Sequence, residues 1–175
     1  MNSLKKNIVK IPDSSEGNFV TKYFPNWSIP YLHLSRADRP TGTWLLLLPC
    51  LFGILLACIE KNNLSISFYE IWLLIACSIG AFLMRGAGCT WNDILDKDYD
   101  AKVKRTQNRP IPSGQVTIRR AIYWMIVQSL LAFIILLTFN KFSILVACLS
   151  LLLVTIYPLA KRFTWWPQIF LGLAF

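Results

Sequence analysis

The feature that most constrains this chain is the separation of its charged residues from long apolar segments. Uncharged runs cover residues 40–59, 121–140 and 142–160, and Arg85 is the one charge within residues 71–92. An uncharged run of about 20 residues is long enough to cross a bilayer as an α-helix. We therefore predict an all-α protein, a polytopic transmembrane helical bundle, with spans near residues 41–59, 71–91, 121–140 and 142–160.

A fifth uncharged run begins after Arg162 and stops at the last residue, Phe175. Its 13 residues rise ~1.5 Å each and reach about 20 Å of a hydrocarbon core that is ~30 Å thick. We therefore expect four full spans plus a truncated fifth, so that the chain is the front part of a longer protein or a truncated product.

The basic residues predict an orientation for these spans. Six Lys or Arg lie in the first 40 residues and seven lie in residues 92–120, whereas the intervening loops hold only Lys61 and Lys141. Because basic loops stay cytoplasmic, we expect a cytoplasmic N-terminus, with residues 92–120 and Lys161 on the same side. The net charge of +9 then reflects topology and attraction to anionic lipid, and predicts no nucleic-acid partner.

The first 33 residues differ from the rest, and we treat 1–33 as a cytoplasmic N-terminal tail and interfacial segment. Residues 1–22 are polar and mixed in charge, which predicts an unstructured tail. Aromatic residues between Tyr23 and Tyr31 predict a segment at the membrane surface. The single histidine, His33, cannot build a histidine metal site or a catalytic triad. The five cysteines all lie within predicted spans, where thiols behave as small hydrophobes.

Residues 92–100 place four carboxylates and one carboxamide at the mouth of the second predicted span. If the helix continued through them at 100° per residue, one arc of its surface would hold most of these side chains, and Asp98 would face away. The residues on that arc would be Arg85, Asn92, Asp93, Asp96 and Asp100. Carboxylates this close repel one another, and a divalent cation removes that cost. The stretch therefore predicts a metal site beside the membrane.

Magnesium suits this site better than calcium does. A calcium loop starting at Asp96 would need Gly at its sixth position and Glu at its twelfth, where this chain has Ala101 and Gln107. Mg²⁺ takes few carboxylates and shares its shell with water and phosphate oxygens. A solvated helix end formed with the neighbouring lysines remains an alternative, although the one-sided arrangement and the intramembrane Arg85 argue against it.

The segment after the acidic residues is basic and contains strong turn formers. Pro110, Pro112 and Gly114 stop a helix and predict a compact turn. Such a turn can hold Arg105 and Arg109 over the acidic residues. Thr117 is a candidate N-cap for the third span.

Two further cationic groups belong to the same predicted face. Tyr157 lies one helical turn before Lys161, so the hydroxyl and the ammonium group can face one ligand. Arg39 lies at the entrance to the first span. A metal ion together with arginines is a common way to hold a diphosphate.

Five stretches together resemble the UbiA superfamily of membrane prenyltransferases, and within it the 4-hydroxybenzoate polyprenyltransferases. They are Arg36–Thr43, Met84–Cys89, Asn92–Asp100, Val103–Gly114, and Tyr157-Pro158 with Lys161-Arg162. The acidic motif joined to the Arg-Thr-x-Asn-Arg-Pro run is highly specific, whereas the Arg-x-Asp-Arg-Pro stretch alone is weak. The resemblance covers nearly everything from Leu34 to Phe175.

The resemblance implies a bundle of about nine spans around a cavity open to the membrane. It also implies two Asp-rich motifs that hold magnesium on the diphosphate of a polyprenyl donor. Residues 34–175 would be the N-terminal portion of such a membrane prenyltransferase domain. They contain only the first motif, so this segment alone is expected to turn over little or not at all.

The resemblance also assigns roles to individual residues. Catalytic residues would be Asp93, Asp96 and Asp100; metal ligands Asn92, Asp96 and Asp100; diphosphate ligands Arg105, Arg109, Tyr157 and Lys161; and ligands of the aromatic acid Arg39 and Arg85. The implied function is magnesium-dependent transfer of a polyprenyl group from polyprenyl diphosphate to the ring of 4-hydroxybenzoate, in ubiquinone biosynthesis. The implied location is the bacterial inner membrane, with the lipid bilayer as surroundings and protein partners unknown.

Three alternatives stay open. The acceptor could be another aromatic compound, such as a naphthoate quinone precursor, or a haem. The chain could be a non-catalytic truncated membrane fragment or an assembly partner. A transporter would also use intramembrane charge, but it would not explain why the acids and arginines gather at one face.

Overall fold

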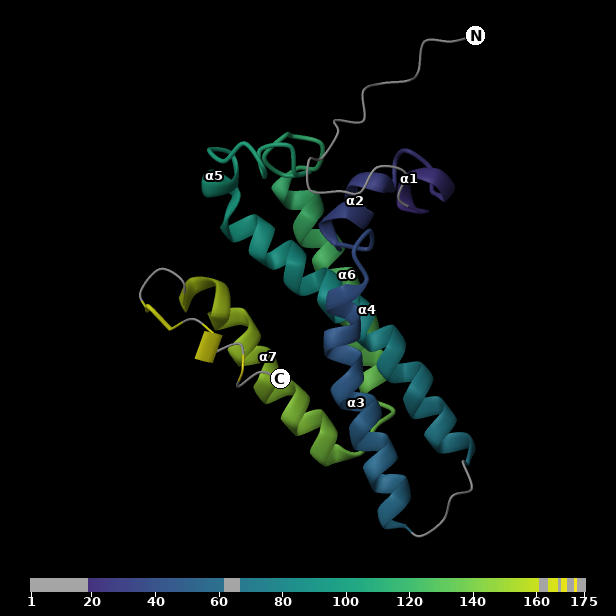
Figure 1. The fold of residues 1–175 in the computed structure, drawn as a ribbon. Helices are drawn as coiled ribbons and strands as arrows, with labels where there is room; N and C mark the ends of the chain where they lie inside the picture. The colour runs from purple at the N-terminus through teal and green to yellow at the C-terminus, as the bar shows by residue number, and fades with distance from the viewer. Residues whose placement is uncertain (1–18, 62–66, 161–163, 167, 170–171, 173–175) are drawn as a thin grey trace.

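The computed structural model describes residues 19–61, 67–160, 164–166, 168–169 and 172. Within this part of the chain it contains only α-helices as regular structure (Figure 1). The helices are α1 (Phe19–Tyr23), α2 (Ile29–Leu34), α3 (Thr41–Glu60), α4 (Phe68–Leu95), α5 (Lys97–Asp100), α6 (Ile118–Leu136) and α7 (Lys141–Ala160).

The four long helices confirm the predicted all-α membrane architecture. By length and composition, α3, α4, α6 and α7 can each cross a bilayer, and few of their residues are buried inside the protein. Their outward side chains are apolar, including Leu56 of α3, Ile75 of α4, Ile134 of α6 and Leu152 of α7. An apolar surface of this extent suits lipid and not water. The chain is therefore an integral membrane protein. The predicted fifth span lies largely outside the described residues.

Local hydrogen bonds explain where two of the spans begin. Ser67 and Glu70 form a capping box at the start of α4, in which the Glu70 carboxylate accepts from the Ser67 backbone N–H at 2.7 Å and from the Ser67 hydroxyl. Thr117 caps α6, since its Oγ1 accepts from the backbone N–H of Arg120. The N-cap predicted at Thr117 is confirmed.

The packing of the helices gathers the polar segments at one end of the bundle. α4 is central and makes its largest contacts with α6 and α3 (Figure 1). At one end, Lys61 pairs with Glu70 at 3.2 Å, and the Trp72 indole N–H donates to Thr138 Oγ1 at 2.9 Å. At the other end, the Trp91 indole N–H donates to the Thr155 carbonyl at 3.3 Å. The end of α4 therefore lies beside the end of α7, and it also lies near the start of α6, because Ile94 packs on the cluster that contains Ala121.

The structure differs from the sequence predictions in two places. Residues 19–22 belong to α1 and not to an unstructured tail, because Val20 is fully buried against Ile29 and Ala37. The second span also does not continue through the acidic motif. α4 ends at Leu95, and Asp96 leaves the helical conformation with φ −89° and ψ 5° before the single turn of α5.

Glycines in the bundle make room for polar side chains. A Cβ on Gly42 would overlap the guanidinium group of Arg85, and a Cβ on Gly86 would overlap the Gln128 amide and press on Ser35. Gln128 is 2% exposed and donates to Ser35 Oγ at 3.0 Å. The Trp124 indole N–H donates to the same oxygen at 2.8 Å. Gly86 therefore allows α4, α6 and the end of α2 to meet.

This packing predicts different effects for two neighbouring glycines. Gly86→Ala should destabilise the protein by about 1–3 kcal/mol, because the new methyl group must displace Gln128 from its bond to Ser35. Gly88→Ala should be neutral or slightly stabilising, since nothing lies within 4 Å of its Cβ position and alanine favours helices. Thermal unfolding of both variants in the same detergent measures the difference, and equal midpoints would contradict this packing.

Candidate functional site

A buried carboxylate and two arginines form the centre of the polar end. Asp93 is 1% exposed. Its Oδ1 accepts from Arg36 Nη2 at 2.8 Å and lies 3.4 Å from Arg109 Nη1. Arg109 Nη1 also donates to Asp100 Oδ2 at 2.7 Å. The network thus joins four segments: the α2–α3 junction with Arg36, the last turn of α4 with Asp93, the short helix α5 with Asp100, and the loop after α5 with Arg109.

Arg36 is held in an unusual backbone conformation. Its φ is +53°, the one positive value among non-glycine residues in the described part of the chain. Left-handed backbone is common at the residue that follows a helix, and here it lets the Ala37 N–H donate to the Leu32 carbonyl at 3.0 Å and close α2. Burial lowers the pKa of Arg36, but neighbouring groups, chiefly the charge and hydrogen bond of Asp93, together outweigh burial and hold this pKa above its usual value. Arg36 therefore remains charged.

Arg109 is positioned by the compact loop that the prolines predict. Thr106 Oγ1 donates to the Asp100 carbonyl at 2.9 Å, which folds the loop back onto α5. The Arg109 carbonyl accepts from the backbone N–H of Ser113 at 3.0 Å.

Gly114 turns the chain with φ +74°, which suits glycine. Ile111 and Val116 then pack on Leu34 and Ala121, anchoring the loop to α2 and α6.

The acidic residues have distinct surroundings. Asp93 and Asp100 are buried and share Arg109, whereas the Asp98 side chain is 84% exposed and faces away, as the spacing predicts. Asn92 and Asp96 lie one turn apart, with the Asp96 N–H donating to the Asn92 carbonyl at 2.9 Å. Both are partly exposed. The predicted single arc assumes one continuous helix through residues 92–100. Because the helix breaks at Asp96, the side chains after it do not follow that arc.

A small polar cavity lies beside the network. It is lined by His33, Arg36, Asp38, Arg39, Asp93, Arg109 and Pro110 and has room for about one water molecule. Three buried atoms in these residues lack a hydrogen-bond partner within the described structure: Asp93 Oδ2, Asp38 Oδ1 and Arg109 Nε. Buried polar atoms normally have partners. The cavity is therefore suited to a small polar ligand that can bond to these atoms.

The predicted ligand residues are distributed around this end of the bundle. Arg39 Nε lies 3.3 Å from Asp38 Oδ2. Arg85 packs against Gly42, and its buried Nε has no hydrogen-bond partner among the residues described. Arg105 lies exposed on the loop. Tyr157 is near the end of α7, two residues after the Trp91 contact. Lys161 lies outside the described residues.

The donor set has the right chemistry for magnesium but does not form a closed cage. No group of three or more His, Cys, Asp or Glu side chains comes together as a metal site within residues 19–61 and 67–160 or the described positions beyond them. Asp93 Oδ1 and Asp100 Oδ2 face arginines instead. Mg²⁺ often takes one or two protein oxygens and completes its shell with water and phosphate. The carboxamide of Asn92 and the carboxylate of Asp96 fit that mode of binding.

Sequence reasoning missed two members of this cluster as functional candidates. The sequence analysis proposes a binding role for Arg39 at the entrance to the first span, but none for Arg36 in the same basic stretch. The sequence excludes His33 from a histidine metal site or a catalytic triad, yet its Nδ1 lies 3.6 Å from Asp38 Oδ1 in the polar cluster. Burial raises the pKa of Asp38, but the nearby His33 ring and the charge of Arg39 lower it by more, so the net shift of this pKa is downward.

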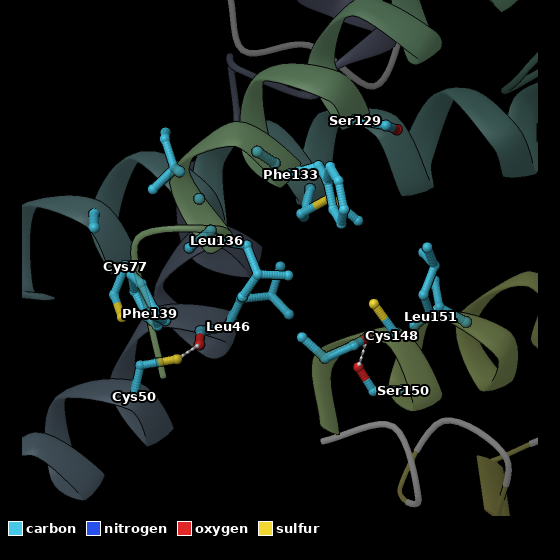
Figure 2. Close-up of a pocket in the computed structure, with 18 residues that line it drawn as sticks. Leu46, Cys50, Cys77, Ser129, Phe133, Leu136, Phe139, Cys148, Ser150 and Leu151 are labelled. Carbon is cyan, nitrogen blue, oxygen red and sulfur yellow. Dashed lines mark hydrogen bonds between the residues drawn. The ribbon is translucent and has the colours of Figure 1, made fainter. Parts of the chain in front are cut away.

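An apolar cavity of about 330 Å³ lies deeper in the bundle, among α3, α4, α6 and α7 (Figure 2). Its walls include Leu46, Met84, Phe133, Leu136 and Leu151. Such a volume falls within the range of small-molecule sites. Met84 lines the cavity and Asp93 lies nine residues further along α4, so the apolar cavity and the polar end lie along the same helix, with Arg85 between Met84 and Asp93 in sequence.

Comparison with known proteins gives a consistent result. The model of the UbiA prenyltransferase family matches residues 46–175. The Bos taurus protein named "4-hydroxybenzoate polyprenyltransferase, mitochondrial" is 49% identical over 146 residues, which are 83% of this chain and 38% of that protein. Proteins of the same name from Arabidopsis thaliana and Caenorhabditis elegans are 47% and 45% identical, over 90% and 99% of this chain.

The matches extend over only part of each relative. The chain spans 38% of the length of the Arabidopsis thaliana protein and 46% of the Caenorhabditis elegans protein. No solved structure matches the chain significantly.

The ion-pair network predicts that Asp93 and Asp98 respond differently to the same change. Asp93→Asn leaves two part-buried guanidinium groups facing a neutral amide, although Arg109 keeps Asp100 as a partner, and it should cost about 3 kcal/mol of stability. Asp98→Asn should change little, because exposed charges contribute little. Thermal unfolding in detergent distinguishes them, and comparable midpoints for the two variants would show that Asp93 does not hold the network together.

Proposed function

Because the chain belongs to the UbiA prenyltransferase family, we propose that its protein transfers a polyprenyl group from polyprenyl diphosphate to the ring of 4-hydroxybenzoate, a step of ubiquinone biosynthesis. The observation that carries this proposal is the juxtaposition of the Asp93 network, rich in arginine, with an apolar cavity along one helix. A diphosphate needs the positively charged side chains of the Asp93 network, and an isoprenoid chain needs the apolar cavity. The relatives named above carry this activity in their names.

We assign the diphosphate to the polar end. Asn92 and Asp96 would hold Mg²⁺, which when bound supplies positive charge to the leaving diphosphate. Arg109 would turn part of its guanidinium group from Asp100 toward the phosphate oxygens, with Arg105, Tyr157 and Lys161 contributing further donors. Asp93 would keep Arg36 and Arg109 in place, and Asp100 would support the loop. Guanidinium groups held before the ligand arrives lower the cost of stabilising the developing charge.

We assign the carboxylate of the aromatic acid to Arg85, with Arg39 as a second candidate. The Nε of Arg85 is buried without a partner among the described residues, so a carboxylate would satisfy it. A charged side chain within a span is costly and usually marks a function. This position would place the ring between the polar end and the apolar cavity.

The apolar cavity would receive part of the isoprenoid chain. Its lining is almost entirely apolar, so it excludes the water that would otherwise capture an allylic cation. Helix surfaces that face lipid would let a longer tail extend into the bilayer.

We further propose that the polar end faces the cytoplasm, or the mitochondrial matrix in an organelle, following the distribution of basic residues. The membrane would be the bacterial inner membrane or its mitochondrial counterpart. The relatives' names include the word mitochondrial, which describes those proteins.

The experiment uses membranes containing the protein expressed from its complete reading frame. Polyprenyl diphosphate and labelled 4-hydroxybenzoate should yield a lipid-soluble product that a metal chelator abolishes. Asp96→Asn should reduce transfer to background because a metal ligand is lost, whereas Asp98→Asn should retain near-normal transfer.

Two outcomes would contradict this proposal. An equal loss of prenyl transfer in both variants would contradict the role of Asp96 as a metal ligand. Transfer to a naphthoate or a haem, with none to 4-hydroxybenzoate, would agree with prenyl transfer but would contradict 4-hydroxybenzoate as the acceptor.

A further inference from the structure

Four large aromatic side chains lie exposed on α1 and on the turn that joins it to α2. Phe19 and Tyr23 are one helical turn apart on α1, so they share one side of it, and Phe24 and Trp27 follow in the turn. Tyr23 is 72% exposed and Trp27 is 76% exposed. We call these four residues the aromatic edge. The proposed prenyl transfer uses none of them, and an exposed apolar patch commonly marks a contact with another molecule or with a membrane.

The aromatic edge is held in place because α1 packs on α2. Val20 is fully buried against Ile29 and Ala37, so the opposite side of α1 is the side that faces outward. α2 in turn contacts α4 and α6. Figure 1 shows α1 and α2 at the same end of the bundle as α5. The packed part of the chain therefore presents the aromatic edge at the polar end.

Hydrogen bonds to α6 place the end of α2 at the level where a membrane span begins. Arg120 is the last charged residue before the uncharged residues 121–140. Ser35 Oγ accepts from Trp124 and from Gln128. These two residues lie four and eight positions beyond Arg120, which is about 6 and 12 Å further along the helix. The end of α2 therefore lies beside the uncharged part of α6 and not in the water above it.

The surrounding aromatic residues and the charge of the segment both suit a bilayer surface. Trp44 near the start of α3 and Tyr123 near the start of α6 are also exposed, and Trp and Tyr concentrate at the level of lipid headgroups. Residues 19–34 contain Lys22 and no Asp or Glu, so lipid phosphates would meet no like charge. Lys22 Nζ lies 5.3 Å from the centre of the Tyr23 ring. An ammonium group beside an apolar ring matches the boundary between headgroups and acyl chains.

We propose that the aromatic edge docks on the lipid bilayer at the boundary between headgroups and acyl chains, so that α1 and α2 form an anchor at the membrane surface. The four aromatic side chains enter this boundary, and Lys22 stays with the phosphates. The surface segment that the sequence predicts from Tyr23 is thereby extended to α1. Because α2 leads directly into the junction that carries Arg36, the anchor sets the depth at which Arg36 meets Asp93.

The test uses the complete protein in nanodiscs of phosphatidylcholine, with Asn26 replaced by p-acetylphenylalanine and labelled with a hydroxylamine nitroxide. Asn26 is exposed and lies within the turn, so all four aromatic residues and the native cysteines remain. Electron paramagnetic resonance compares the collisions of the label with apolar oxygen and with a polar nickel chelate. Oxygen collisions should dominate, at a depth of about 5–10 Å into the boundary. The same label should report water at Lys102 and lipid at Leu152, which are both exposed.

Matched variants separate the aromatic edge from a general effect on the protein. Phe24→Ser combined with Trp27→Ser should raise the collisions of the label at position 26 with the nickel chelate, because the label leaves the lipid. Phe142→Ser should not change them, since this exposed aromatic residue lies at the start of α7, at the other end of the bundle. Circular dichroism and elution volume check that each variant remains folded.

Two results would overturn the proposal. In the first, the label at position 26 collides with the nickel chelate as often as the label at Lys102 does, which would place the aromatic edge in water. In the second, the label is shielded from oxygen and from the nickel chelate alike, which would show that another part of the protein covers the aromatic edge.

Discussion

The ion pair between Asp93 and Arg36 is the interaction on which the polar end of this bundle depends. A carboxylate that is 1% exposed needs compensating charge, since an unpaired buried charge is strongly unfavourable. Its partners lie 57 and 16 residues away in sequence. By drawing in Arg36 and Arg109, Asp93 fixes the α2–α3 junction and the long loop against the end of α4. The guanidinium groups are thereby arranged before a ligand is present.

The membrane explains why this chemistry is confined to one end. Charged side chains are costly along the spans, so the acids and arginines gather where α3 and α6 begin and α4 and α7 end. Arg85 is the exception, and Gly42 leaves the space that its guanidinium group occupies. Glycine at a helix contact thus permits a charge to lie beside an apolar cavity, where an amphipathic substrate would be held by both of its ends.

The spans could be predicted from charge alone, and the details could not. Thr41–Glu60 and Lys141–Ala160 match the predicted spans almost residue for residue. α4 starts at Phe68, ahead of the predicted start, because the Ser67–Glu70 capping box extends it into polar sequence. The break at Asp96 has no signal in the spacing of the acids, and the left-handed backbone of Arg36 ends α2, where the Ala37 N–H donates to the Leu32 carbonyl at 3.0 Å. The spacing of the motif indicates neither feature. The sequence predicts that Arg109 lies over the acidic residues, but not that Arg36 pairs with Asp93.

We propose that the acidic motif and its arginines hold a metal-bound diphosphate at the lipid boundary. Equilibrium binding of a fluorescent polyprenyl diphosphate to the complete protein in nanodiscs tests it most directly. Binding should be saturable, should require Mg²⁺, and should be lost when inorganic pyrophosphate or a chelator is added. Binding that persists unchanged without a divalent cation, or that pyrophosphate fails to displace, would contradict it.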